Sequence, residues 1–190
     1  MSESDVYPVF LKLAGKPVLV VGAGSVAERK IVGLVEARAL VRVVAPMATP
    51  ALERMAFEGA IEWHRRRFED ADASSVWLIV ASTNDPEAQR RVAAAADARR
   101  VFLIAVDDRE NASAYSGAIV NRPPFTIAIS SSGAAPAMTR LLREVIEHVL
   151  PSDEWMEHAR RLRARWLAEA TPMGARFGEL VRELAAKAPI

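Results

Sequence analysis

The sequence predicts an α/β protein in which a parallel sheet is followed by a small α+β region and then by helices. Three observations predict this fold class. Short apolar runs alternate with helical patterns in the first part of the chain, the first run enters a glycine-rich turn, and the alternation stops after Val106. Strands that alternate with helices form parallel sheets through right-handed crossovers. We therefore expect an α/β domain over residues 1–112, an α+β region over 113–150 and a helical region over 151–190.

Five apolar runs are the predicted strands of the parallel sheet. They are Pro17–Val21, Leu40–Ala45, Ala60–His64, Val76–Ala81 and Val101–Val106. Continuous apolar runs of this length are typical of strands that are buried on both faces. Helices are expected directly after the glycine-rich turn, over Pro50–Phe57 and over Glu87–Arg99. The last of them follows Asp85-Pro86, which is a strong helix-start signal.

Beyond Val106 the predicted elements are a hairpin, a loop and three helices. Strands are expected over Ala118–Val120 and Phe125–Ser130, with a turn over Asn121–Pro124 between them. A loop of small residues follows, and Pro136 suits the first turn of a helix that continues to about Val149. Residues 152–190 are expected to form two helices that are divided near Thr171–Gly174.

The composition argues against several classes of function. The chain has 190 residues, a formal net charge of +1 and no cysteine. A net charge near zero creates no global field toward nucleic acid or membrane. The lack of cysteine excludes disulfides, thiolate metal sites and a cysteine nucleophile. The first residues do not resemble a signal peptide, and the apolar runs are too short to cross a bilayer. We expect a cytoplasmic protein with no nucleic-acid or membrane partner.

Gly22-Ala23-Gly24-Ser25-Val26-Ala27 is the G-x-G-x-x-A form of the dinucleotide-binding fingerprint. Gly22 permits the tight turn, Gly24 lets the backbone approach a pyrophosphate, and Ala27 lets the helix pack closely on the sheet. The motif follows an apolar strand and opens an amphipathic helix, whose N-terminal N–H groups favour phosphate. The sequence therefore predicts a Rossmann-type domain in which Gly22, Gly24, Ser25 and Val26 contact a dinucleotide.

The end of the second predicted strand lacks the acid that usually binds the ribose of NAD. The chain reads Val44-Ala45-Pro46-Met47 there, so we expect the backbone of Pro46 and Met47 to contact the ribose. Arg42 raises the alternative of NADP, but it lies among valines in the strand and is expected at a surface. We favour NAD. Asn84 follows the fourth strand and is predicted to cover the cofactor, with a turn role as its alternative.

Four stretches make the chain resemble the precorrin-2 dehydrogenase / sirohydrochlorin ferrochelatase family, the N-terminal module of siroheme synthases. They are Tyr7–Leu11, Val20–Lys30, Ile104–Asp107, and Ile129–Pro136 with the Arg140-Leu141-Leu142-Arg143 that follows. The resemblance covers nearly the whole chain and implies a stand-alone form, without the methyltransferase half of fused synthases.

The resemblance implies that the chain oxidises precorrin-2 to sirohydrochlorin with NAD⁺. It also implies a homodimer, in which residues 113–150 form the dimerisation and substrate region. Some members also insert Fe²⁺ to give siroheme, so Fe²⁺ or Co²⁺ is a further expected substrate. The siroheme and cobalamin branches both stay open as the destination of the product.

Asp107 is the catalytic residue that the resemblance implies. It closes the fifth predicted strand, at the edge of the sheet where ligands of open α/β folds bind. A carboxylate there can accept the proton that is released as a hydride leaves for the nicotinamide. Asp108 is the rival base. Successive strand residues point to opposite faces, so we expect only one of the two to face the substrate, and we choose Asp107.

The loop and the helix after the hairpin carry the predicted substrate contacts. Ser131 is assigned by its match to the loop serine of the family, with Ser130 and Ser132 as alternatives, and Gly133 lies in the same loop. An ordinary polar loop is the competing interpretation.

Arg140 and Arg143 lie three residues apart on the helix that follows this loop, and therefore share one face. Arginine binds carboxylates, such as those of precorrin-2, in bidentate geometry. The alternative is a solvated face that pairs with Glu144 and Glu147. The three histidines share no ligand spacing, so we expect no preformed metal site.

A ligand-sensing Rossmann module is the alternative function. Such a module would bind NAD(H) and report the redox state to a partner without catalysis, and it would need neither Asp107 nor the serine-rich loop. A chelatase without dehydrogenase activity lies between the two. NAD⁺-dependent turnover of precorrin-2 would identify the dehydrogenase, metal insertion into sirohydrochlorin without that turnover would identify the chelatase, and NAD binding without tetrapyrrole binding would favour the sensing module.

Overall fold

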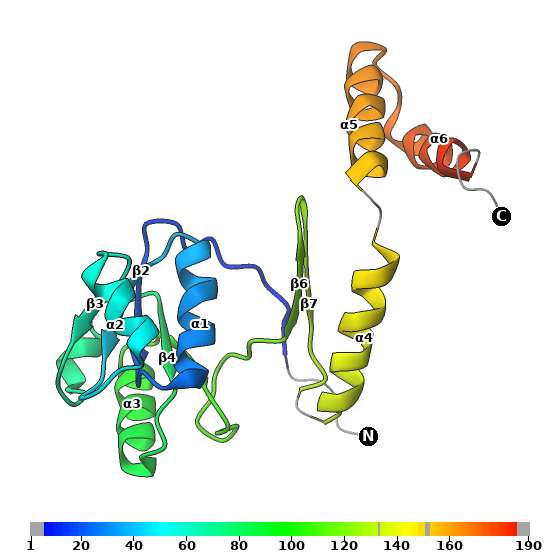
Figure 1. Cartoon of the computed structure of the whole chain (residues 1–190). Coiled ribbons are helices and arrows are strands. Elements are labelled where there is room, and N and C mark those ends of the chain that lie inside the picture. The colour runs from blue at the N-terminus through cyan, green and yellow to red at the C-terminus, as the bar shows by residue number, and fades with distance from the viewer. Residues whose placement is uncertain (1–5, 133, 151–152, 186–190) are drawn as a thin grey trace. The chain divides into compact units, whose positions relative to one another are not determined.

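The computed structural model describes residues 6–132, 134–150 and 153–185 of the chain. The chain divides into two compact units, which Figure 1 draws as ribbons. The first unit comprises Met1–Gly117 and Ser130–Ala135, and the second comprises Ala118–Ile129 and Pro136–Ile190. The three-region division expected from the sequence stays a prediction.

The first unit is a parallel sheet with helices on both faces. Its strands are β1 (Pro17–Val21), β2 (Leu40–Val44), β3 (Glu62–His64), β4 (Leu78–Ala81) and β5 (Phe102–Ala105). Their order is β3-β2-β1-β4-β5, and all neighbouring pairs are parallel. The helices are α1 (Ser25–Glu36), α2 (Pro50–Phe57), α3 (Pro86–Ala98) and a short 3₁₀ helix, η1 (Asp70–Ala73). The predicted Rossmann-type fold is confirmed.

The sheet is buried on both faces, which explains the continuous apolar runs of its strands. Val18 and Val20 of β1 pack in one cluster with Ile31 of α1. Leu19 of β1 packs in the other cluster with Val92 of α3. Thus α1 and α2 cover one face and α3 covers the other (Figure 1). Each fully buried side chain of this kind contributes roughly 1.5–3 kcal/mol, so the two clusters fix the positions of the helices.

The strand predicted from Ala60 begins later, at Glu62. The reason is the end of α2, where Gly59 adopts a φ of +74° and the N–H of Ala60 donates to the carbonyl of Met55 at 2.9 Å. Ala60 therefore completes the helix end and is not available to the sheet. The helix η1 was not predicted, because four residues give no periodic signal.

The second unit contains a hairpin and three helices among its described residues. The elements are β6 (Ala118–Arg122), β7 (Phe125–Ile129), α4 (Pro136–Val149), α5 (Asp153–Ala168) and α6 (Met173–Ala185). The strands β6 and β7 are antiparallel and α4 packs against them (Figure 1). The predicted turn over Asn121–Pro124 is shorter than expected, because Asn121 and Arg122 pair with Thr126 and Phe125. The two prolines that remain have no N–H to donate to a ladder.

Helices α5 and α6 contact each other. Met156, Leu162 and Trp166 of α5 are buried, and the indole N–H of Trp166 donates to the Glu179 carboxylate of α6 at 2.6 Å. Among the helices described here, none is both long enough and apolar enough to span a membrane.

Candidate functional site

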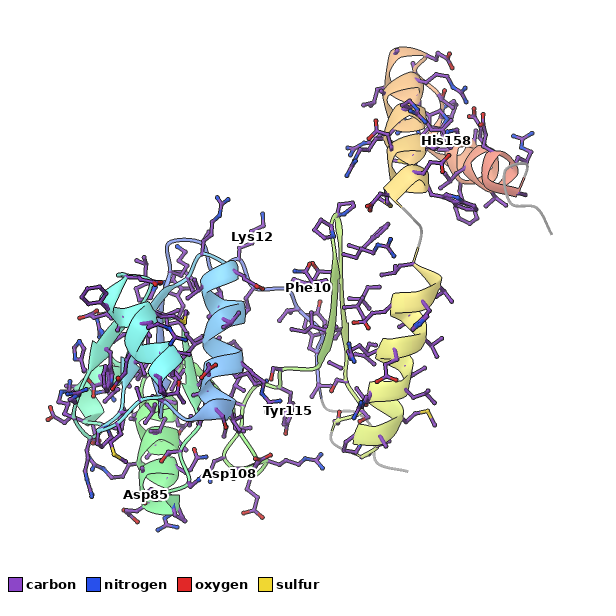
Figure 2. All side chains as sticks on the ribbon, viewed as in Figure 1. Phe10, Lys12, Asp85, Asp108, Tyr115 and His158 are labelled. Atoms are coloured by element: carbon purple, nitrogen blue, oxygen red, sulfur yellow. The ribbon has the colours of Figure 1, made fainter. Side chains whose placement is uncertain are left out.

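An open pocket of about 840 Å³ lies at the carboxyl ends of β1, β2, β4 and β5 in the first unit. The residues that line it come from the segments after these four strands and from the start of α3. They include all seven predicted cofactor contacts and the predicted catalytic residue, namely Gly22, Gly24, Ser25, Val26, Pro46, Met47, Asn84 and Asp107. The fold thus brings together residues that are more than eighty positions apart in the sequence. Figure 2 shows Asp85 and Asp108 at this end of the unit.

Gly22 makes the turn from β1 into the pocket. Its φ is +101°, and its N–H donates to the carbonyl of Val44 at 3.0 Å. A Cβ at this position would collide with the backbone carbonyl of Ser82. Both the backbone conformation and the lack of space therefore require glycine.

Gly24 has a different reason to be glycine. It is the N-cap of α1 with an extended backbone, and a Cβ there would meet no protein atom within 4 Å. No side chain among the described residues caps the first N–H groups of α1. The open space and the uncapped helix N-terminus together fit a pyrophosphate that approaches the backbone closely.

The segment after β2 is fixed against the glycine turn by Thr49. The Thr49 N–H donates to the carbonyl of Ala23 at 3.1 Å, and the Thr49 hydroxyl donates to the Glu28 carboxylate at 2.7 Å. The same hydroxyl oxygen caps α2. Pro46 and Met47 are therefore held beside the turn, and the Met47 side chain is 81% exposed. Glu28 was missed from the sequence because it follows the fingerprint rather than forming part of it.

Arg42, which raised the alternative of NADP, lies in β2 opposite Glu62 of β3. Its Nε is 3.4 Å from the Glu62 carboxylate, and it does not line the pocket. Its guanidinium is therefore not available for a 2′-phosphate, as the sequence argument expected.

Asp107 and Asp108 differ in what their carboxylates contact. Asp108 accepts hydrogen bonds from the side-chain amide of Asn111 at 2.6 Å and from its backbone N–H at 3.3 Å. Asp107 is exposed, lines the pocket and has no hydrogen-bond or ion-pair partner within the described parts of the chain. Its φ is +59°, a conformation that Asp tolerates better than most residues. The free carboxylate is therefore that of Asp107.

The choice of Asp107 over Asp108 from the sequence relied on a strand geometry that the structure contradicts. It assumed that both residues continue the strand, but β5 ends at Ala105. Both acids belong to the segment after the strand, where the left-handed conformation of Asp107 and the hydrogen bonds of Asp108 separate their roles.

Gln89 of α3 is a pocket residue that the sequence argument missed. Its side chain is buried, and its amide N–H donates to the carbonyl of Val106, next to Asp107, at 3.3 Å. Its Oε1 has no hydrogen-bond partner in the described part of the chain. The available signal was a polar residue on the apolar face of a predicted helix, three residues before Val92. Further missed lining residues are Ser82, Thr83, Arg90, Glu110 and Asn111.

The serine-rich loop groups with the first unit, although its flanking elements belong to the second. The guanidinium of Arg109 donates to the carbonyl of Ser132, so the loop is tied to the segment that carries Asp107. The Ser131 hydroxyl oxygen accepts the N–H of Ala135 at 3.2 Å, and Ser131 does not line the pocket. Gly133, also predicted to bind substrate, lies outside the described residues.

Arg140 and Arg143 lie on α4 of the second unit and pair with glutamates of the same helix. Arg140 is 3.0 Å from Glu144, and Arg143 is 2.5 Å from Glu147. The hydrogen bond from Arg140 lowers the pKa of Glu144. These contacts match the solvated-face alternative, and the substrate role of the two arginines stays a prediction.

The described residues contain no group of three or more His, Asp or Glu side chains arranged to hold a metal ion.

Two protein families match the chain. Residues 9–118, more than half of the chain, match the family described as "Putative NAD(P)-binding". Residues 123–148 match the family described as "Sirohaem biosynthesis protein central". The first match covers the pocket, and the second covers the end of the hairpin and most of α4.

Individual relatives agree with these families. The chain is 44% identical to Siroheme synthase 1 of Klebsiella pneumoniae over 149 residues, which are 78% of this chain and 32% of that protein. It is 46% identical to Siroheme synthase of Neisseria meningitidis over 145 residues, which are 76% of this chain and 30% of that protein. The chain thus spans about a third of the length of the curated relatives it matches.

The fold is also that of a solved structure named "SirC, precorrin-2 dehydrogenase". The TM-score is 0.75 at 23% identity, over 93% of this chain and 88% of that chain. At this identity the likeness establishes the fold alone. The family match over residues 9–118 covers more than half of the chain, so the chain belongs to the family described as "Putative NAD(P)-binding", and its residues 123–148 match a sirohaem biosynthesis family.

Proposed function

We propose that this chain oxidises precorrin-2 to sirohydrochlorin with NAD⁺. The single observation that carries the proposal is the free carboxylate of Asp107 in the pocket that all the predicted dinucleotide contacts line. The siroheme synthases that match the chain and the precorrin-2 dehydrogenase that shares its fold support the choice of substrate.

The residues present fit the dinucleotide. Gly22 and Gly24 would leave room for the pyrophosphate, and the N-terminus of α1 would face it with N–H groups. Pro46 and Met47 would contact the ribose. We favour NAD⁺ over NADP⁺ because the segment Ala45–Thr49 contains no cation for a 2′-phosphate.

The reaction removes a hydride and a proton from the substrate. When bound, the nicotinamide ring accepts the hydride. Asp107 would accept the proton, because its carboxylate lines the pocket and accepts no hydrogen bond from another described residue. The products are sirohydrochlorin, NADH and the proton that Asp107 later releases to solvent.

The test is anaerobic turnover of precorrin-2 with NAD⁺, followed by NADH absorbance. Asp107→Asn is the sharper variant, because Asn also tolerates a positive φ and keeps the turn. Loss of the general base is expected to reduce the rate by about 10²–10⁴-fold, with NADH affinity unchanged. Asp108→Asn is expected to cost far less.

Two results would contradict this proposal. An unchanged rate in Asp107→Asn would refute the assigned base. No NADH formation by the wild-type chain from active precorrin-2 would refute the dehydrogenase, and NADH binding without turnover would favour the sensing module.

Insertion of Fe²⁺ or Co²⁺ into sirohydrochlorin is an additional activity to be tested at the same site. The nitrogens of the tetrapyrrole would hold the metal, and the Asp107 carboxylate would collect the protons that they release. An insertion rate equal to the uncatalysed rate with both metals would exclude it.

We further propose that the chain forms a homodimer in the cytoplasm, as expected for an NAD-dependent biosynthetic enzyme. An exposed apolar stripe on α4 supports the dimer. It consists of Met138, Leu141, Leu142, Val145 and Val149, all at least 44% exposed. Thr139, Arg143 and Ile146, which are more covered, lie on a different side of the helix. Contiguous apolar patches of this kind mark protein interfaces.

A further inference from the structure

Lys30 lies on α1, three residues beyond the glycine fingerprint Gly22–Ala27. Its side chain is half-buried, and its ammonium donates a hydrogen bond to the hydroxyl of Ser116. Within the described residues it forms no ion pair with a carboxylate. An ammonium group has three donors, so this bond leaves two of them available.

The position of Ser116 places Lys30 beside the segment that starts at Asp107. Burial lowers the pKa of Lys30, the neighbouring charge of Arg29 lowers it further, and the Asp107 carboxylate acts in the opposite direction. The ammonium is therefore within electrostatic range of the proposed base. A partly buried charge without a counter-ion is costly, and an anion that reaches this place would remove part of the cost.

The surrounding charges show why a cation is needed here. Asp108 and Glu110 line the pocket next to Asp107, so three carboxylates face an incoming ligand. A tetrapyrrole with carboxylate side chains would be repelled unless cations offset them. Of the other cations nearby, Arg90 pairs with Glu87 at 2.6 Å, and Arg109 uses one of its five N–H donors on the carbonyl of Ser132. Arg29 is exposed on α1 and belongs to the same turn as Lys30.

We propose that Lys30 binds a carboxylate of the tetrapyrrole substrate next to Asp107. The inference rests on the proposed function and names a substrate contact that the pocket residues do not supply. Its ammonium would keep the Ser116 hydrogen bond and use its remaining donors for the ligand. The contact would orient the edge of the macrocycle relative to the base.

The experiment measures binding of uroporphyrin, a stable tetrapyrrole with carboxylate side chains, by fluorescence. Lys30→Met is compared with Lys30→Arg, which keeps the charge. Lys12→Met is the matched control, because Lys12 is exposed and lies at the opposite end of the first unit from Asp108 (Figure 2). NADH dissociation constants and thermal unfolding are measured for every variant.

Lys30→Met is expected to weaken uroporphyrin binding by about tenfold or more, as loss of a hydrogen bond to a charged group does. Lys30→Arg retains most of the affinity, and Lys12→Met retains all of it. NADH affinity and thermal stability stay unchanged. With precorrin-2, Lys30→Met raises KM more than it lowers kcat.

Equal uroporphyrin affinity in Lys30→Met and wild type would overturn the proposal. A parallel loss of NADH affinity or of thermal stability would also overturn it, because Lys30 would then support the fold. Lys30-dependent uroporphyrin binding by a wild-type chain that yields no NADH from precorrin-2 would refute only the proposed function. Normal NADH formation with no effect of Lys30→Met would refute only the role of Lys30.

Discussion

The two glycines of the turn differ in why a side chain is excluded: at Gly22 the fold excludes it, and at Gly24 we propose that the ligand does. Gly22 faces the backbone of Ser82 and has a left-handed φ, so the folded chain itself excludes a side chain there. Gly24 faces open space, so only a ligand would compete with a side chain at this position. One motif therefore contains a glycine that the fold requires and a second glycine that we propose the ligand requires.

This difference predicts opposite results for two alanine variants. Gly22→Ala is expected to destabilise the protein by about 2–4 kcal/mol, because the collision is with backbone and the φ is unfavourable. Gly24→Ala is expected to unfold like the wild type yet to bind NADH at least about tenfold more weakly. Urea unfolding and NADH titration of both variants check this. Normal NADH affinity in Gly24→Ala would show that the pyrophosphate does not approach Gly24.

At the scale of single residues, the sequence could predict which residues line the pocket only where the cause is local. The fingerprint and its helix lie within a short stretch, and the lining residues after each strand follow from the parallel topology. Two other contacts depend on the tertiary structure. One is the hydrogen bond between Lys30 and Ser116, which are 86 positions apart, and the other is the hydrogen bond from Gln89 to the carbonyl of Val106. No periodicity or spacing encodes such contacts, so the sequence could not reveal them.

At the scale of elements, the short helix η1 is held by one ion pair, in which the Asp72 side chain is buried and the Arg66 side chain is 37% exposed. The Asp72 carboxylate accepts two hydrogen bonds from the Arg66 guanidinium, at 2.6 and 2.7 Å, and one from the N–H of Glu69 at 2.9 Å. Burial on its own would raise the pKa of Asp72, but the hydrogen bonds from Arg66 and Glu69 outweigh it and lower the pKa. The lowered pKa means that the ionised form stabilises the folded state.

Asp72→Asn is expected to lower the free energy of unfolding by about 1.5–3 kcal/mol near pH 7. Because the pKa is lowered in the folded state, this stabilisation is present above the ordinary aspartate pKa of about 4 and is lost as the pH falls further. The difference from wild type should therefore shrink below about pH 4. Urea unfolding at several pH values measures it.

Asp70→Asn is the matched control, because Asp70 pairs with Arg91 at 3.0 Å while both side chains are more than half exposed. Its effect is expected to stay below about 1 kcal/mol. An Asp72→Asn penalty that stays constant down to pH 3 would contradict the assigned role of the charge.

Element boundaries show where sequence reasoning stops. The strands of the sheet were found because they are continuous apolar runs, whereas the start of β3 depends on how α2 ends at Gly59. In the hairpin, the pairing of Arg122 with Phe125 shortens the turn that the prolines predicted. In both places backbone hydrogen bonds decide the boundary, within the end of α2 in the first case and between the two strands of the hairpin in the second, and composition does not contain that information.

At the scale of the whole molecule, the apolar stripe of α4 bears on the proposed homodimer. Leu142→Glu together with Val145→Glu is expected to convert the dimer to monomers, because two charges would be buried without partners. Sedimentation velocity measures the change. Ala137→Glu, an exposed position of the same helix outside the stripe, is the control and should leave the dimer intact. A dimer that persists in the double variant would place the interface elsewhere.

The loop Ser130–Ala135 belongs to the first unit although it is flanked by segments of the second, and this affects how recombination could exchange the two units. The chain leaves the first unit after Gly117, comes back for one loop and leaves again at Pro136. A single recombination break at Gly117 would therefore separate the first unit from its loop, and the hydrogen bond between Arg109 and Ser132 would be lost. Replacement of the second unit alone would need three breaks at once, after Gly117, Ile129 and Ala135, so the two units are expected to be inherited together rather than shuffled as separate modules.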